Sequence, residues 1–217
     1  DGTHLLSHEG VIRHDSEFVA AVPLRWNDHW VYTIATGLLF VADDALTSGA
    51  LEIPDAGGDR VASACLLDDE IIVTTWNRRM HVYRGSGEPW DGWRRESRQL
   101  PSFVCVAPDE PWGVVFDHHT ETTAWSGPFS YEIVDDVRDL EGPLARTNVV
   151  DEPGLMQIVA EPLSRGRLLI WRETQRSAAV DVGSREGVHA TMRAQTLPPV
   201  YQQALVSRDG ARVAFHD

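Results

Sequence analysis

The feature that most constrains the fold is an internal repeat of hairpin-like segments. Five times along the 217 residues, an apolar run is followed by a short polar turn and a second apolar run. The turns are Asn27-Asp28-His29, Asp68-Asp69-Glu70, Asp109-Glu110-Pro111, Ser164-Arg165-Gly166 and Arg208-Asp209-Gly210. Turns rich in Asp, Asn and Gly between apolar runs are typical of β-hairpins. The repeat therefore predicts an all-β chain built from one recurring unit.

Each repeat is predicted to add a third and a fourth strand to its hairpin. The predicted hairpins are Phe18–Leu24 with Trp30–Ala35, Val61–Leu67 with Ile71–Thr75, Phe103–Ala107 with Gly113–Phe116, Met156–Ala160 with Leu168–Trp171, and Gln203–Val206 with Arg212–Phe215. The predicted third strands are Leu38–Ala42, Met80–Tyr83, Thr123–Trp125 and Ala178–Val182. Outer strands end at Ile53-Pro54, Leu100-Pro101 and Leu197-Pro198, where proline suits the end of an edge strand. The fifth unit stops after two strands, and Thr3–Ser7 with Val11–His14 supply two more.

Four-stranded antiparallel units of this kind predict a five-bladed β-propeller that forms one domain. The expected blades are 18–54, 55–101, 102–143, 144–199, and 200–217 together with 1–17, or about 43 residues each. Sharing one blade between the two ends of the chain closes the ring and leaves no terminal edge. The inner strands carry small residues, which suits a narrow axis: Ala20, Ala21, Ala62, Ser63, Ala64, Cys105, Ala160 and Ala204. The alternative is a two-sheet sandwich of similar length.

One hairpin carries a family resemblance. The segment Val206–Phe215 resembles the Ser-x-Asp-Gly-x-x-Val-Ala-Phe hairpin of WD40-like and TolB-type propeller repeats. The resemblance covers one blade, and the other four share only its pattern. It implies a propeller repeat fold.

Charge narrows the range of partners. The net charge is −14, with 33 acidic and 19 basic residues, whereas binding to nucleic acid or to an anionic membrane needs a positive face. The local clusters Arg78–Arg79 and Arg94–Arg95–Arg98 have acidic residues close by, and we interpret them as solvated surface. No apolar run of membrane-spanning length and no signal peptide is visible, and both cysteines lie in apolar runs, so we expect a cytoplasmic protein. The first residue is Asp1 rather than Met, which suggests processing or excision from a longer chain.

Two groups of residues are candidate sites of chemistry. Glu17, Asp59 and Glu152 begin inner strands of three blades, where converging carboxylates would suit glycoside hydrolysis or glycan binding. Solvated strand-entry carboxylates are the plainer interpretation. The second group is Asp117-His118-His119 with His216-Asp217 and His14-Asp15, which offers zinc ligands or proton carriers. Neighbouring histidines on a strand point to opposite faces, so we expect turn histidines and neither a metal nor a cofactor.

A tryptophan-containing loop is the preferred binding candidate. Trp90, Trp93, Arg94 and Arg95 lie in the polar insertion Gly85–Arg98. Tryptophan beside arginine is typical of a protein-interaction hot spot, although these indoles could also stack on a sugar or pack back onto the blade. No nucleophile elbow, P-loop or dinucleotide fingerprint is present. The sequence therefore favours a non-catalytic module that binds a partner protein or another domain of its parent chain, with the Asp117–His119 loop as a second contact. The alternative is a glycan-binding or glycoside-hydrolase-like propeller.

Overall fold

A computed structural model of the chain describes residues 3–7, 10–14, 24–42, 48–53, 59–89, 92–116, 129–142, 148–150, 155–174, 178–194, 203–206 and 213–216. The chain divides into two compact units, Asp1–Gln99 and Leu100–Asp217. Each unit is built from antiparallel sheets in which strands that follow one another in the sequence lie side by side. Such meanders are what hairpin chemistry at every turn produces.

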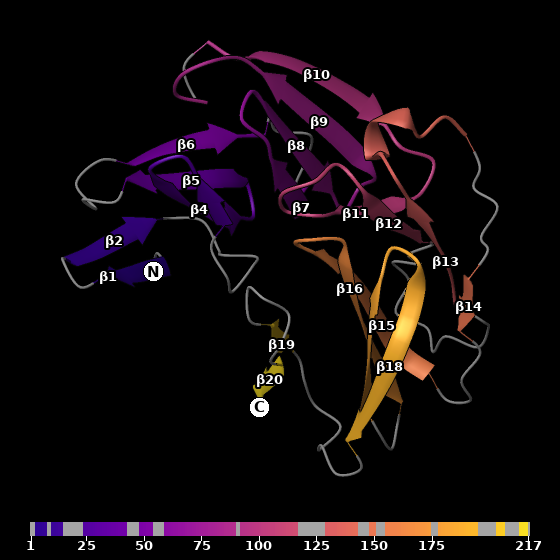
Figure 1. Cartoon of the computed structure of the whole chain (residues 1–217). Helices are drawn as coiled ribbons and strands as arrows, with labels where there is room; N and C mark the ends of the chain where they lie inside the picture. Colours follow the sequence, from indigo (N-terminus) through magenta and orange to yellow (C-terminus); the bar gives the residue numbers. More distant parts are fainter. Residues whose placement is uncertain are drawn as a thin grey trace. The chain divides into compact units, whose positions relative to one another are not determined.

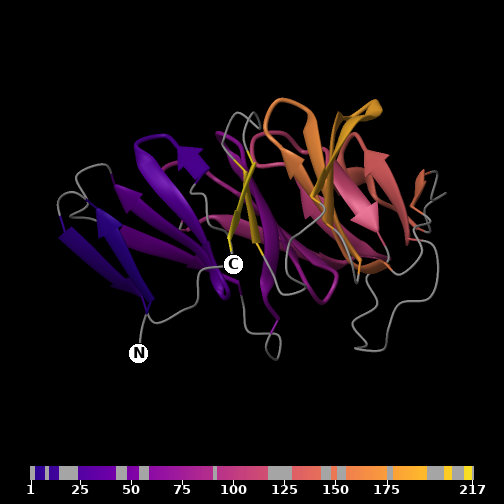
Figure 2. The same ribbon diagram turned by 90° about the horizontal axis from the view of Figure 1, so that it is seen from below.

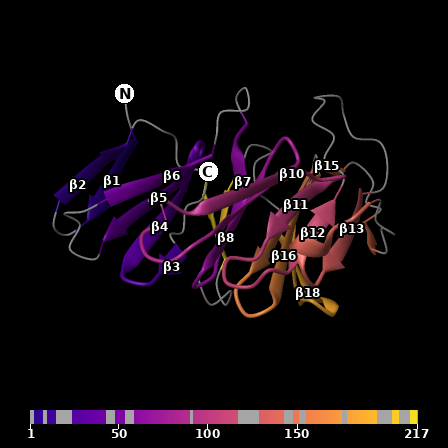
Figure 3. The ribbon, with the colours of Figure 1, turned by 90° about the horizontal axis from the view of Figure 1, so that it is seen from above.

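The first unit holds one hairpin and two four-stranded sheets (Figures 1 and 3). The hairpin pairs β1 (Thr3–Ser7) with β2 (Gly10–His14). The first sheet contains β3 (Leu24–Trp26), β4 (His29–Ile34), β5 (Gly37–Ala42) and β6 (Ser48–Glu52) in that order. The second contains β7 (Val61–Leu66), β8 (Glu70–Thr75), β9 (Arg79–Arg84) and β10 (Arg94–Gln99). Strands β3 and β4 contact β7, so the two sheets pack against one another.

The second unit repeats this plan. One sheet contains β11 (Phe103–Val106), β12 (Gly113–Phe116), β13 (Phe129–Val134) and β14 (Asn148–Val150), with a 3-10 helix at Val137–Asp139. The other contains β15 (Leu155–Leu163), β16 (Arg167–Thr174), β17 (Ala178–Ser184) and β18 (Gly187–Ala194). Strands β11 and β12 contact β15. The last hairpin pairs β19 (Gln203–Val206) with β20 (Val213–His216), drawn in yellow in Figure 2.

The all-β prediction and the hairpin pattern are confirmed, whereas the number of complete blades differs. The described residues form four four-stranded sheets and two two-stranded hairpins, not five four-stranded sheets. The predicted closure between the two ends of the chain remains a prediction. One strand prediction was wrong: the strand that pairs with β12 after β11 is β13, not Thr123–Trp125. The third sheet also includes β14. The predicted strand Phe18–Leu24 lies outside the described residues except for Leu24, where β3 begins.

The core of the first unit forms where its two sheets meet. Alternate residues of β4 and β5 and the inner face of β8 bury their side chains completely, among them Val31, Leu38, Phe40 and Ile71. Each such side chain stabilises the fold by about 1.5–3 kcal/mol relative to an exposed one. Packing of this kind fixes the ends of the strands, and the connections at those ends form the site.

Candidate functional site

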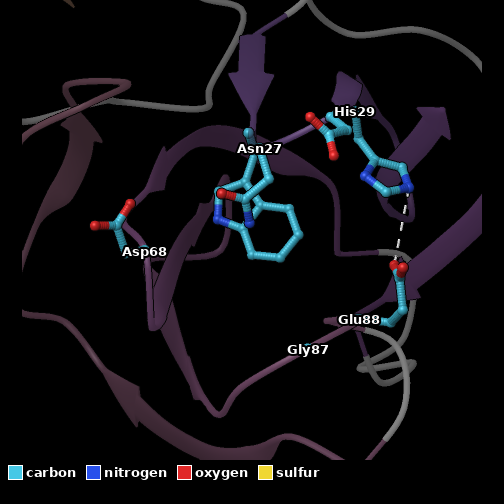
Figure 4. A pocket seen from close by; sticks show the side chains of 7 residues that line it. Asn27, His29, Asp68, Gly87 and Glu88 are labelled. Carbon is cyan, nitrogen blue, oxygen red and sulfur yellow. Dashed lines mark ion pairs between the residues drawn. The ribbon is translucent and has the colours of Figure 1, made fainter. Parts of the chain in front are cut away.

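A pocket of about 200 Å³ opens where three connections of the first unit meet (Figure 4). They are the β3–β4 turn, the β7–β8 turn and the β9–β10 loop. Seven residues line it: Trp26, Asn27, Asp28, His29, Asp68, Gly87 and Glu88. In an antiparallel meander, alternate connections lie at the same end of the sheet, which brings the β7–β8 and β9–β10 connections together. The packing of β3 and β4 against β7 brings the β3–β4 turn to the same place.

The base of the pocket is a fixed tryptophan. Trp26 is 6% exposed, and its indole Nε1 donates a hydrogen bond of 2.9 Å to the carbonyl oxygen of Leu67 in the β7–β8 turn. Its ring meets Phe40 edge-on at 5.8 Å and Trp93 at 6.0 Å. Aromatic pairs in this geometry add about 0.5–1.5 kcal/mol beyond their buried area. The β3–β4 and β7–β8 turns are therefore held at a constant separation.

The β9–β10 loop is held by close packing. The Gly85 amide donates to the carbonyl oxygen of Asp69, at 3.2 Å. A Cβ atom on Gly85 would lie 2.5 Å from Cγ of Trp93, so only glycine lets the indole approach this closely. Trp93 is half-buried against the core, and its indole Nε1 has no hydrogen-bond partner among the residues that the structure describes. Trp93 therefore anchors the loop, and its predicted role in binding stays a prediction.

The rim of the pocket is acidic. Asp28, Asp68 and Glu88 are exposed, and the side chain of His29 is 14% exposed with Nε2 3.8 Å from a Glu88 oxygen. Figure 4 shows His29 and Glu88 facing one another on one side and Asp68 on the other. Within the described part of the chain, neither Asp28 nor Asp68 has an ion-pair partner, and no three acidic, histidine or cysteine side chains are placed to hold a metal ion. The arrangement suits an organic cation or a hydrogen-bond donor.

Several predicted site residues lie outside the described residues: Glu17, Trp90, Asp117, His118, His119 and Glu152. Arg94 and Arg95 are exposed on the outer strand β10, and Nη2 of Arg94 lies 3.4 Å from Glu96. The structure therefore brings only the loop before them, through Gly87 and Glu88, into the pocket.

Asp59 is buried at the base of a turn. One carboxylate oxygen accepts a hydrogen bond of 2.7 Å from the Thr75 hydroxyl, and the other accepts one of 3.1 Å from the Asn77 amide. Both oxygens are thus engaged in holding the β8–β9 turn. The distances from Asp59 to the carboxyl groups of Glu17 and Glu152, on which the glycoside-hydrolase alternative depends, involve residues outside the described ranges.

The acidic rim was not predicted. In the sequence, Asp28 and Asp68 fit ordinary hairpin turns, and Glu88 fits a polar insertion. The acidic rim could have been predicted from the equivalent positions of these turns in neighbouring repeats, because such turns come together when their sheets pack.

Comparison with known proteins bears on the fold. No family model and no curated protein matches the sequence. Among solved structures, the Dos1 propeller superposes with a TM-score of 0.50 at 12% identity, over 85% of this chain and 49% of that one. Apo AztD from Citrobacter koseri gives a TM-score of 0.40 at 13% identity, over 87% and 52%. This chain thus spans about half the length of either structure.

The likeness to the Dos1 propeller, together with the repeated four-stranded meanders, shows a β-propeller fold. A shared fold does not define a shared chemistry, which depends on the residues of the site. Among the described residues, no helix is long and apolar enough to span a bilayer.

Proposed function

We propose that this chain is a non-catalytic propeller module that binds a cationic segment of a partner protein, or of another domain of its parent chain, at the acidic pocket. One observation carries the proposal: the loop predicted to make contacts forms, with two hairpin turns, a pocket rimmed by three exposed carboxylates.

Size and charge favour one basic side chain as the group that enters. A pocket of about 200 Å³ is smaller than the 300–1,000 Å³ typical of sites for drug-sized ligands. Two opposite charges 4 Å apart attract by about 4 kcal/mol at an effective dielectric constant of 20, before the cost of desolvation. The net charge of −14 also steers cations toward the molecule and opposes nucleic acids and anionic membranes.

We also propose that the protein is cytoplasmic. Cys65 and Cys105, the two cysteines of the chain, do not form a disulfide bond, which fits a cytoplasmic location. Trp90, Arg94, Arg95 and the Asp117–His119 loop remain candidates for additional contacts with the partner.

The test is peptide binding measured by calorimetry. The probe is a hexapeptide in which three arginines alternate with glycine. The comparison peptide has glutamate in place of each arginine. We expect the arginine peptide to bind, and Asp28→Asn with Asp68→Asn to weaken it about tenfold or more, because each exposed charge is worth about 0.2–1 kcal/mol and a pocket adds to this.

The matched control is Asp69→Asn, since Asp69 is also exposed in the β7–β8 turn but does not line the pocket. Equal binding of both peptides, or equal weakening by the control, would refute the proposal.

We further propose that the two hairpins complete a fifth blade, in the strand order β19-β20-β1-β2. Each hairpin is half of the four-stranded unit that occurs four times. A circular permutant tests this: residue 217 is joined to residue 1 by a short glycine linker, and new ends are opened between β5 and β6. We expect a cooperative unfolding transition close to that of the parent. A permutant that unfolds or aggregates, while one with a long linker folds, would reject the shared blade.

A further inference from the structure

The turn between β8 and β9 presents an exposed tryptophan beside arginines. Trp76 is 40% exposed, Arg78 is exposed and Arg79 is half-buried. Because consecutive connections of a meander lie at opposite ends of the sheet, this turn is at the far end of the second sheet from Asp68 and the pocket. It is therefore a separate surface of the same sheet.

Hydrogen bonds hold the backbone of this turn in one conformation. The Arg78 amide donates to the Thr75 carbonyl oxygen at 3.1 Å, which closes the turn. Asp59 accepts from the Thr75 hydroxyl at 2.7 Å and from the Asn77 amide at 3.1 Å, as described above. The Thr75 hydroxyl in turn accepts from the Arg79 amide at 3.2 Å. One buried carboxylate thus organises the whole turn from below.

Neighbouring strands support the turn from both sides. The Trp76 amide donates to the Arg60 carbonyl oxygen at 2.9 Å, just before β7. The side-chain amide of Gln99, at the end of β10, donates to the Asn77 carbonyl oxygen at 2.9 Å. A surface that is rigid before binding loses little conformational entropy when a partner docks.

The backbone at Arg78 is strained. Its φ is 60°, in the left-handed region that glycine and asparagine tolerate and that other residues rarely adopt. A glycine here would fold with less strain. Strain of this kind concentrates at functional positions, where the side chain has a use that glycine cannot serve.

Charge sets this turn apart from the acidic remainder of the chain. For the guanidinium groups of Arg78 and Arg79, no ion pair is formed with any described residue, although acidic residues outnumber basic ones 33 to 19 in the chain. Arginine presents a planar fork of donors that matches a carboxylate, and tryptophan and arginine are the residues most enriched at the centres of protein interfaces.

We propose that the turn Trp76–Arg79 docks an acidic segment of a partner protein. The two guanidinium groups take carboxylates, and the Trp76 indole takes an apolar side chain next to them. This surface is distinct from the pocket of the proposed function and has the opposite charge. The two sites can therefore succeed or fail independently.

The test uses the peptide Ac-Glu-Asp-Leu-Glu-Asp-Phe-Glu-NH2 and its counterpart in which every acid is replaced by its amide. Binding to the full chain is measured by calorimetry at low and at high salt. We expect the acidic peptide to bind, the amide peptide to bind at least tenfold more weakly, and the affinity to fall as salt rises.

Arg78→Gly separates a binding role from a structural one. Glycine relieves the strained backbone, so the variant should unfold at the same or a higher urea concentration while its affinity for the acidic peptide falls about tenfold. Trp76→Ala should weaken binding by a similar factor. Arg165→Gly, which removes another exposed arginine with a positive φ (63°) from the β15–β16 turn, is the matched control and should bind as the parent does.

Several outcomes would overturn the proposal. Equal affinity of the parent, Arg78→Gly and Trp76→Ala for the acidic peptide would do so, as would no binding at millimolar peptide. If a 12-nucleotide single strand binds more tightly than the acidic peptide, and the same variants weaken that binding, the ligand is a nucleic acid and not an acidic polypeptide. Self-association that is lost in Arg78→Gly and unaffected by peptide would make the partner a second copy. Pocket variants Asp28→Asn and Asp68→Asn should leave acidic-peptide binding unchanged, so failure of one proposal does not decide the other.

Discussion

Replacing Asp59 with alanine tests whether this carboxylate holds the fold together. The change removes the acceptor of two hydrogen bonds, one from the Thr75 hydroxyl and one from the Asn77 amide. Thr75 is completely buried, so its hydroxyl proton finds no water in place of the lost oxygen. The β8–β9 turn would lose its support from below.

The magnitude follows from these two bonds. A hydrogen bond to a charged group contributes about 1.5–3 kcal/mol, and a buried donor left without a partner costs about 1–3 kcal/mol. Two such bonds would contribute about 3–6 kcal/mol, but water can replace the one at the exposed Asn77, so we expect Asp59→Ala to lower the free energy of unfolding by about 2–4 kcal/mol, a large part of the 5–15 kcal/mol typical of a domain. Asp59→Asn keeps one carbonyl acceptor and should cost less, about 1 kcal/mol.

Urea unfolding followed by circular dichroism measures the effect. The control is Asp69→Ala: Asp69 is exposed, and its contact with the Gly85 amide uses the main chain only, so a change within about 0.5 kcal/mol is expected. A double-mutant cycle with Thr75→Val should show a coupling of about 1 kcal/mol or more, because the two side chains are in contact. If Asp59→Ala unfolds at the same urea concentration as Asp69→Ala, the structural role assigned to Asp59 is refuted.

Three further predictions concern the first unit. Gly85→Ala places a Cβ atom 2.5 Å from the Trp93 ring and should cost about 1–3 kcal/mol in urea unfolding while changing tryptophan fluorescence; an unchanged emission spectrum would contradict the packing described. Burial raises the pKa of Tyr83 from 10.0 to about 12, so the unfolded chain ionises first and stability should fall between pH 10 and 12; Tyr83→Phe should remove this part of the decline, and parallel pH profiles would argue against it. Burial, with the positive charge of Arg95, lowers the pKa of His81. Stability should therefore fall as the pH drops below about 6.5, because the unfolded chain takes up the proton there and the folded chain does not. His81→Gln should show a flatter dependence of stability on pH, and carbon-13 NMR should show that the His81 ring is protonated at a lower pH than a free histidine.

Hairpins were the part of the fold most accessible from sequence. The second sheet illustrates why, since the predicted pair Val61–Leu67 and Ile71–Thr75 differs from β7 and β8 by one residue at two of the four strand ends. Turn chemistry acts between neighbours in the chain, so a local pattern is enough to identify it.

The third sheet shows where local reasoning failed. The prediction of Thr123–Trp125 assumed a short connection after Gly113–Phe116, as in other repeats. The observed third strand, Phe129–Val134, has polar residues at Ser130 and Glu132 between apolar ones, an alternation that indicates a half-buried strand. A long insertion moved the strand without changing its role.

The two proposed binding surfaces were harder to predict from the sequence than the hairpins. Asp28 and Asp68 are far apart in the sequence, and only the packing of one sheet on the next brings their turns to one pocket. Nothing in the residues around Arg78 indicates a positive φ, because the strain comes from the three-residue connection between β8 and β9.

The contact between adjacent sheets has a consequence for the order of the repeats. In the first unit, His29 of a hairpin turn faces Glu88 in the last connection of the next sheet. In the second unit the corresponding places hold Glu110 and Arg185, which form an ion pair, and the arginine also lies 5.3 Å above the Trp112 ring. If the two following sheets were exchanged, Glu110 would meet the carboxylate of Glu88, and His29 would face the guanidinium of Arg185 in place of a carboxylate. These side chains therefore favour packing between sheets that are consecutive in the chain.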